Sequence, residues 1–406
     1  MQELPLEGIR VADFCHVWAG PHVTQWLAVM GAEVIKIESH LRPDLTRSFF
    51  AGGKTLMPGL NQSVDFAVLN YTKKGCTINM TLPRGIELVK EIIKLSDVVT
   101  ENFGGPVMER WGLGYPDLKK LRADIILYSG SGFGRTGPYK EFPAYAPIID
   151  AFAGLTSLNG YAGGGPVPFG VGGWTDLTAA QHGAFAILAA LHHRFRTGEG
   201  QHIDLSMSEV GCAFLPDAIM DYTMNDRVQR PQGNRDIAMA PHGCYRCQGE
   251  DNWVTIAVST DEEWEALCHA MGDPEWADDE RFRDGLSRWT NQEELDRLIQ
   301  GWTSNYTDWQ AAVLLQEAGV MAGPTLSPQA VVQDRHLAER GFFIDMEHPE
   351  MGKVRLPRLP LNMNHSPFGK YEHAPSIGEH NDYVFRELLK MPEEEIARLQ
   401  EEQVIF

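Results

Sequence analysis

Short apolar runs alternate with amphipathic segments from the start of the chain to Tyr128, and this alternation constrains the fold more than any other feature. Ile9 to Phe14 predicts a buried strand. A helix is expected to start at Pro21 and to end at Gly31, with apolar residues on one face. The next strand is expected at Val34 to Glu38. This order is typical of a β-α-β unit in a parallel sheet.

The same pattern repeats further along the chain. A helix is expected near Arg84, and strands at 97–100 and 124–128. We therefore predict an α/β class, with a doubly wound, Rossmann-like large domain. Ligands bind beyond the carboxyl ends of the strands in such folds, so residues 14–21 and 101–104 become candidate ligand loops.

From about residue 225 the pattern indicates a second, smaller α+β domain. Two hairpin strands are expected at 243–247 and 253–258, and Thr260 and Thr307 each begin a capping-box sequence that starts a helix. The predicted division is a large α/β domain at 1–222, a small domain at 223–335, and a segment at 336–406 that returns to the large domain.

Composition excludes several classes of function. A net charge of −20 argues against a nucleic-acid or anionic-membrane partner. The first ten residues lack the pattern of a signal peptide, no apolar run reaches membrane-spanning length, and the six cysteines are scattered, so a cytoplasmic protein with reduced thiols is expected. Cys244 and Cys247 form a C-x-x-C near His242, but no further spaced ligands complete a metal site, and no metal is predicted.

The segment from Gly132 to Gly137 matches G-x-G-x-x-G after a predicted strand. Pro138, Pro143 and Pro147 deny it the helix that would bind a pyrophosphate. A glycine turn near a ligand is expected there, and NAD binding is not.

Asp176 is expected at the start of a long helix, Leu177 to Phe195. From spacing alone an N-cap is the better interpretation, because aspartate is preferred at that position. A catalytic carboxylate stays open as the alternative, since glycine-rich stretches at 163–166 and 172–173 would permit close approach of a substrate and a moving loop.

Basic residues near the predicted ligand loops could bind a phosphorylated ligand, although most such residues only solvate a surface. They are Arg42, Arg47, Lys73, Lys74, Arg110 and Arg135.

Seven ordered motifs carry a resemblance to a known family. They are GIRVADFCHVWAGP, GAEVIKIE, TENF with Arg110 downstream, GSGFGRTGPY, WTD through ILAALHHR, RTGEGQHIDLSMSE and SIGEHN. Together, nearly end to end, they resemble the class III CoA transferases of the CaiB/BaiF type. The resemblance implies a large and a small domain, an interlocked dimer, an acyl-CoA and a carboxylic acid as substrates, no tightly bound cofactor, and Asp176 as the nucleophile that carries the acyl group.

The resemblance also implies a set of CoA contacts. These are His16, Val17, Trp18, Ala19, Ile78, Asn102, Phe103, Gly104, Arg110, Ser131, Gly132 and Phe133, with Arg42 as a further phosphate ligand. Trp18 stands where formyl-CoA transferases carry glutamine, and Pro241 to Gly243 replaces their run of glycines. Oxalate and formate are therefore not expected as substrates.

A bulkier acceptor, such as an aryl-substituted succinate taking CoA from succinyl-CoA, would suit Trp18, unless Trp18 only fills core space. Two rival functions stay open. An α-methylacyl-CoA racemase or epimerase shares this fold, but its histidine should fall near Tyr145, where none occurs. The chain could also be a non-catalytic partner subunit, because some relatives are heteromers, so the dimer could hold identical or paralogous chains.

Overall fold

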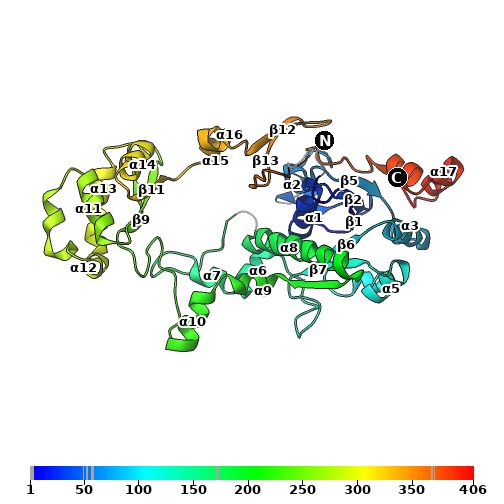
Figure 1. Ribbon diagram of the computed structural model, residues 1–406, viewed down its shortest axis with the longest axis horizontal. Helices are drawn as coiled ribbons and strands as arrows, with labels where there is room; N and C mark the ends of the chain where they lie inside the picture. Colours follow the sequence, from blue (N-terminus) through cyan, green and yellow to red (C-terminus); the bar gives the residue numbers. More distant parts are fainter. Residues whose placement is uncertain are drawn as a thin grey trace. The chain divides into compact units, whose positions relative to one another are not determined.

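The computed structural model describes residues 4–48, 50–51, 54–55, 59–170, 173–366, 369 and 371–406. The chain forms two compact units (Figure 1). The first comprises Met1–Thr156, Pro168–Arg227 and Glu339–Phe406, and the second comprises Ser157–Val167 and Val228–Ala338. That 1–222, 223–335 and 336–406 are folding domains stays a prediction.

A six-stranded parallel sheet forms the centre of the first unit, and the predicted α/β class is confirmed. Its order is β5 (Lys74–Thr77), β2 (Glu33–Glu38), β1 (Arg10–Asp13), β6 (Val98–Glu101), β7 (Ile126–Ser131) and β8 (His202–Ser206). Strand order runs outward in both directions from β1. Because the order reverses between β1 and β6, the loops that follow these strands border a crevice suited to a ligand.

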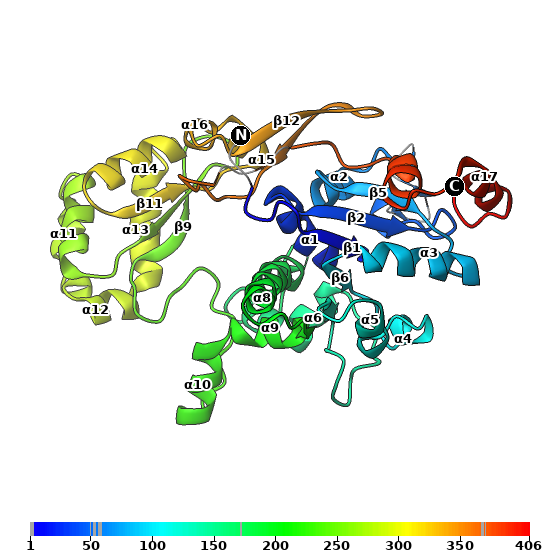
Figure 2. The ribbon, with the colours of Figure 1, turned by 45° about the vertical axis from the view of Figure 1, so that its right-hand side comes forward.

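Helices cover both faces of this sheet, because successive strand residues point to opposite sides. Val11, Val98 and Ile126 pack in one cluster with α1 (Ala19–Val29), α6 (Ala146–Phe152), α8 (Trp174–Thr197) and α9 (Met207–Ala213) (Figure 2). Their chain neighbours Ala12, Val99 and Leu127 pack in another with α3 (Pro83–Lys94), α4 (Val107–Arg110), α5 (Tyr115–Leu121) and α17 (Glu393–Glu401).

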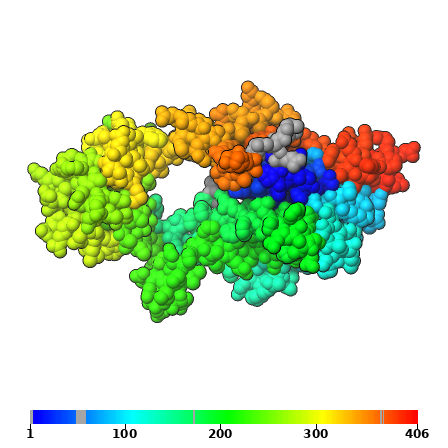
Figure 3. Space-filling model, viewed as in Figure 1, coloured from blue at the N-terminus to red at the C-terminus, as the bar shows by residue number. Residues whose placement is uncertain are grey.

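The C-terminal segment packs on the first unit. Ile405 forms a bridge with Ile78, and Arg84 of α3 pairs with Glu395 of α17. Figure 3 shows this segment, in red, against the light-blue region that contains α3. The remaining elements described in this unit or at its borders are η1 (Leu45–Arg47), β3 (Phe50–Ala51), β4 (Lys54–Thr55), α2 (Val64–Asn70), α7 (Leu155–Leu158), α10 (Pro216–Asn225), α16 (Arg335–Glu339), β12 (Phe343–His348), β13 (Gly352–Pro357) and η4 (Tyr383–Leu388).

The second unit has its own antiparallel sheet, in the order β11 (Met321–Pro324), β10 (Trp253–Ala257) and β9 (His242–Arg246). Its helices are α11 (Asp261–Ala270), η2 (Glu275–Asp278), η3 (Glu280–Phe282), α12 (Gly285–Thr290), α13 (Gln292–Thr303), α14 (Asp308–Glu317) and α15 (Pro328–Gln333). Thr307 and Gln310 form the predicted capping box of α14. Strand β11 is not predicted by its sequence, because Met-Ala-Gly-Pro contains no β-branched or aromatic residue.

None of the helices in the described part of the chain combines the length and apolar character that a membrane crossing requires.

Candidate active site

The loops after β1 and β6 are joined by a reciprocal pair of hydrogen bonds. The backbone N–H of His16 donates to Oδ1 of Asn102 at 2.8 Å, and Nδ2 of Asn102 donates to the carbonyl of His16 at 2.7 Å. One side chain thus satisfies both backbone groups of a loop residue. The two candidate ligand loops therefore lie side by side at the reversal of strand order.

A cavity of about 310 Å³ opens beside these loops. It is lined by His16, Val17, Trp18, Ala19, Asn102, Phe103, Gly104, Gly130, Ser131, Gly132, Phe133, Lys140, Phe142, Pro143, Ala144, Tyr145, Ala146, Asp176 and Met207. Three loops and the first turn of α8 contribute, so segments far apart in the sequence form one site.

Of the residues predicted as the nucleophile or as CoA contacts, most line this cavity, and three do not. Ile78 is fully buried in the core against the C-terminal segment, and its backbone N–H donates to the carbonyl of Glu38. Arg42 and Arg110 are exposed, on the turn after β2 and on α4. Trp18 is half-buried and lines the cavity, which argues against a purely core-filling role.

Lys140 and Tyr145 line the cavity but were not among the residues predicted to bind CoA. Both follow the glycine turn that begins at Gly132, in a proline-containing segment without regular structure before α6. Their position directly after a predicted ligand turn is the signal that could have identified them. Residues 132–145 are all described and form no helix, as expected from the prolines.

Asp176 lies in the first turn of α8, and its prediction as an N-cap is wrong. The helix begins at Trp174, with Gly173 as its N-cap, rather than at Leu177. Asp150 of α6 provides the cap instead: its carboxylate accepts hydrogen bonds from the backbone N–H of Trp174 at 3.1 Å and of Thr175 at 3.0 Å. The helix start therefore does not depend on Asp176 for this role.

Burial, and after it the nearby charge of Asp150, raise the pKa of Asp176 to about 7. Hydrogen bonds from the backbone N–H groups of Ala19 and Gly173 oppose this rise. The carboxylate thus sits in a partly desolvated position in the cavity. A carboxyl group titrating near neutral pH in a cavity is a candidate for chemistry.

Gly173 permits this arrangement, because a Cβ added there would lie 1.8 Å from Cβ of Ala146 in α6. The close approach of the two helices places Asp150 under the start of α8. Gly172 lies outside the described residues, and Gly163 to Pro166 belong to the second unit. That either stretch moves to cover the site stays a prediction.

Most of the basic residues considered as phosphate ligands form ion pairs within the first unit. Arg135 pairs with Glu101 at 2.9 Å, and Lys74 pairs with Glu33 at 2.6 Å. Arg47 and Lys73 are buried, and pair with Glu38 at 2.7 Å and with Asp13 at 3.2 Å. These four residues hold the fold together, and the exposed cations Arg42, Arg110 and Lys140 remain available for a ligand.

The C-x-x-C lies in the second unit. Cys247 is buried in the core of that unit, and Cys244 contacts Oγ1 of Thr325. Nδ1 of His242 interacts with the carbonyl of Asn234 at 2.6 Å. Within the described ranges, no three His, Cys, Asp or Glu side chains gather as metal ligands would.

Comparison with known proteins assigns the family. Residues 6–381 match the model for "CoA-transferase family III". The chain belongs to this family.

Similar proteins with established names agree with this assignment. The chain is 34% identical over 401 residues to the succinyl-CoA–D-citramalate CoA-transferase of Chloroflexus aurantiacus, covering 99% of this chain and 98% of that one. It is 32% identical over 404 residues to the alpha subunit of a succinyl-CoA–L-malate CoA-transferase of the same organism, covering 100% of this chain and 93% of that one. The chain is accordingly a CoA-transferase, acting between acyl-CoAs and carboxylic acids.

A solved structure shares the fold as well. The crystal structure of a CaiB/BaiF family protein from Brucella suis superposes with a TM-score of 0.85 at 30% identity, covering 95% of this chain and 100% of the other. The resemblance read from the seven sequence motifs is thereby confirmed.

Proposed function

We propose that this CoA-transferase moves CoA from a succinyl-CoA-type donor to a carboxylic acid through a covalent intermediate on Asp176. One observation carries this proposal: a partly desolvated carboxylate lines the cavity, is not needed as a helix cap, and has a pKa near 7. A higher pKa reflects greater basicity, so the ionised group is a stronger nucleophile.

The reaction balances without an added cofactor. The Asp176 carboxylate attacks the thioester carbonyl and the C–S bond breaks. This step releases CoA thiolate and forms a mixed anhydride between the acyl group and Asp176. The thiolate attacks the aspartyl carbonyl and releases the donor acid, which leaves an aspartyl-CoA thioester. The acceptor carboxylate attacks this thioester, and the returning thiolate cleaves the second anhydride at the acceptor carbonyl. Acyl-CoA departs, and the Asp176 carboxylate is regenerated.

We propose that the CoA moiety lies along the two joined loops and the turn after β7. Support comes from the cavity lining, to which His16 to Ala19, Asn102 to Gly104 and Ser131 to Phe133 contribute. Lys140, an exposed cation in the cavity lining, suits the phosphates of CoA on a protein of net charge −20.

Lys140→Ala should raise the KM for acyl-CoA about fivefold at low salt, because an exposed charge contributes about 1 kcal/mol to phosphate binding. The kcat should change much less, since Lys140 does not take part in the covalent steps. Steady-state kinetics at two salt concentrations check this. Lys120→Ala is the matched control, because Lys120 is an exposed lysine on α5 outside the cavity. An unchanged KM would remove Lys140 from the CoA site.

The acceptor is proposed to be a dicarboxylic acid of the succinate class. The named relatives use succinyl-CoA with D-citramalate or L-malate. Trp18, Phe133 and Tyr145 line the cavity, and such aromatic surfaces also suit an aryl-substituted succinate. Assay of D-citramalate, malate, glutarate and benzylsuccinate with succinyl-CoA, in wild type and Trp18→Gln, discriminates between these acceptors. Loss of only the aryl acceptor in the variant would assign Trp18 to specificity.

A dimer of identical or paralogous chains is proposed as the working form. Large apolar side chains are exposed on two helices of the first unit: Phe185 (73%) and Phe195 (90%) on α8, and Met224 (73%) on α10. Such surfaces mark protein interfaces. Native mass spectrometry of the protein alone tests for a homodimer, and co-purification from the native host tests for a paralogous partner.

The racemase alternative makes a different prediction. It requires α-proton exchange, so a 2-methylacyl-CoA incubated in D₂O should gain deuterium. We expect no exchange, because the histidine base of a racemase of this fold should fall near Tyr145, and residues 143–146 contain no histidine.

Trapping the intermediate tests the proposal directly. Wild type and Asp176→Ala are incubated with succinyl-CoA and hydroxylamine, and peptides are analysed by mass spectrometry. A hydroxamate is expected on the Asp176 peptide of wild type, with none in the variant. The peptide carrying Asp150 is an internal control, because this buried carboxylate should stay unlabelled. Undiminished CoA transfer by the variant would refute a nucleophilic role.

The pH dependence should follow the Asp176 carboxylate. The rate of adduct formation should rise as pH passes through about 7, because only the ionised form attacks. Asp150→Asn removes the neighbouring negative charge, which lowers the pKa of Asp176, and should move the midpoint down by at least about half a pH unit. Asp117→Asn, on the surface of α5, is the control. A shift to higher pH in Asp150→Asn would contradict the assignment.

A further inference from the structure

Val17 holds an unusual backbone conformation at the centre of the first ligand loop. Its φ is 69°, in the left-handed region that a β-branched residue rarely adopts. Trp18 and Ala19 follow it directly, and both line the same cavity as Asp176. The loop must therefore be held in this conformation by its surroundings.

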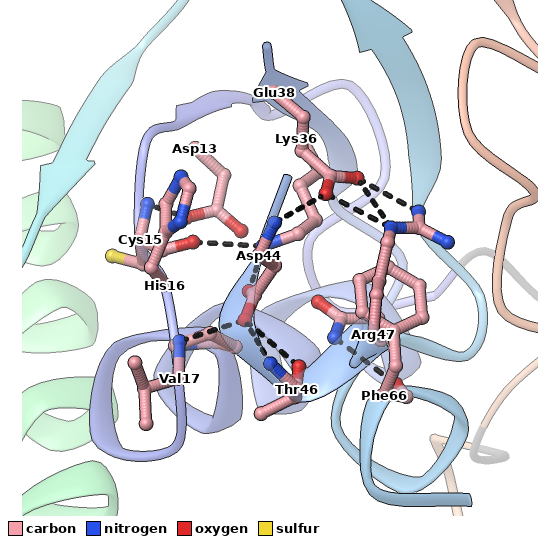
Figure 4. Close-up of polar contacts among 12 residues, drawn as sticks. Asp13, Cys15, His16, Val17, Lys36, Glu38, Asp44, Thr46, Arg47 and Phe66 are labelled. Atoms are coloured by element: carbon pink, nitrogen blue, oxygen red, sulfur yellow. Dashed lines mark hydrogen bonds and ion pairs between the residues drawn. The ribbon is translucent and has the colours of Figure 1, made fainter. Parts of the chain in front are cut away.

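One buried carboxylate contacts this residue. Oδ1 of Asp44 accepts the backbone N–H of Val17 at 3.0 Å, together with the N–H of Thr46 at 3.0 Å and its Oγ1 at 2.8 Å. Asp44 is fully buried, at the start of η1. Figure 4 shows its carboxylate directed at the loop from the segment after β2.

Lys36, in β2, forms a buried ion pair with Asp44. Its Nζ lies 2.9 Å from Oδ2 of Asp44 and donates to the carbonyl of Cys15 at 2.7 Å. The ion pair thus contacts the loop on both sides of His16: Lys36 at the carbonyl of Cys15, and Asp44 at the N–H of Val17. A buried ion pair is often no more stabilising than apolar residues of equal volume, so a stability role does not account for it by itself.

We propose that Asp44 is a positioning residue for acyl transfer, which holds Val17 in its left-handed conformation and so places Trp18 and Ala19 in the cavity with Asp176. This inference rests on the proposed nucleophilic role of Asp176 and goes beyond it. Asp44 is not part of the cavity lining, and acts through the loop backbone.

Two charge-neutral double variants isolate the acceptor atom. Lys36→Met with Asp44→Asn keeps a side-chain oxygen for Val17, whereas Lys36→Met with Asp44→Ala removes it. We call the double variant with Asp44→Ala the alanine pair and the one with Asp44→Asn the asparagine pair. We expect the alanine pair to form the Asp176 adduct at least about thirtyfold more slowly than the asparagine pair, because small displacements of a positioned group lower a reaction rate by up to about a hundredfold.

Rescue by glycine separates positioning from folding. Glycine adopts a positive φ without strain, so adding Val17→Gly to the alanine pair should recover about tenfold in the rate of adduct formation. Val17→Gly should give no such gain in the asparagine pair. Glu38→Gln disturbs the same buried network beside Arg47 without touching Val17, and Val17→Gly should not improve its rate.

The outcomes are distinguishable. If the alanine pair does not fold, Asp44→Glu serves instead, because it keeps the charge and displaces the acceptor, and the same recovery by Val17→Gly is required. Absence of recovery in a folded variant, or equal rates in the two double variants, would overturn the positioning role. Absence of an adduct in wild type would instead overturn the proposed function.

Discussion

Asp176→Asn is expected to lower the turnover of CoA transfer by at least about 10⁴-fold, because a carboxamide cannot form the aspartyl anhydride on which both half-reactions depend. The variant should remain folded, since Asp150 and not Asp176 accepts the backbone N–H groups of Trp174 and Thr175. Steady-state assay with succinyl-CoA and a dicarboxylic acceptor measures the loss. A residual activity above about one per cent would show that another group carries the acyl transfer.

The same substitution should stabilise the fold above neutral pH. The pKa of Asp176 rises from an ordinary 3.8 to about 7 on folding, so the folded state retains a proton that the unfolded chain has lost between these values. The contribution of the Asp176 side chain to the free energy of unfolding is therefore fully present below pH 4 and is lost as pH rises through 7. At about 1.4 kcal/mol per pKa unit, the gain in Asp176→Asn is at most about 4 kcal/mol at pH 8 and close to zero at pH 4.

Thermal unfolding of both proteins at pH 5 and pH 8 checks the sign. The advantage of Asp176→Asn should grow with pH. If the variant is less stable at pH 8, the carboxylate makes favourable contacts that outweigh its burial, and the raised pKa is contradicted.

Arg47→Met should produce the largest loss of stability among single substitutions in the buried ionic network. Arg47 and Glu38 are both almost completely buried, and two of their hydrogen bonds are parallel: Nε to Oε1 at 2.9 Å and Nη2 to Oε2 at 2.7 Å. Removal of the guanidinium leaves the Glu38 carboxylate buried without this partner, which typically costs about 3–5 kcal/mol in the free energy of unfolding.

Further contacts of Arg47 add to this effect. Nη2 also donates to the carbonyl of Pro375 at 2.9 Å, which ties the C-terminal segment to the sheet. The guanidinium lies 3.5 Å from the ring centre of Phe66, and Figure 4 shows these two side chains together. Chemical denaturation measures the loss. The double variant Glu38→Gln with Arg47→Met is the control, because it removes the unpaired charge and should recover part of the stability. A loss below about 1 kcal/mol in Arg47→Met would be incompatible with a buried, charged Glu38.

Local patterns were sufficient for the fold class and for the loops that form the site. Apolar runs and helical periodicity depend on neighbouring residues, so β1, α1 and β2 could be placed closely from the sequence. The reversal of strand order between β1 and β6 then brings their loops together, as parallel α/β folds do. The place of Asp176 near the start of a long helix also follows from local pattern.

The role of individual polar residues depended on partners distant in the chain. Asp176 looked like a helix cap until packing of α6 against α8 brought Asp150 to that helix start. Arg135, Arg47 and Lys73 looked like possible phosphate ligands until folding placed a carboxylate beside each of them. No local signal marks these pairings.

The sequence by itself therefore determined the parallel α/β class, the family and the loops that line the cavity, because each depends on short-range periodicity or on ordered motifs. Only the tertiary structure decided which carboxylate caps α8, which cations stay exposed, and that Asp44 holds the left-handed Val17. The physical reason is burial: the cost of removing a charge from water is offset only by partners that the folded chain brings together from separate elements.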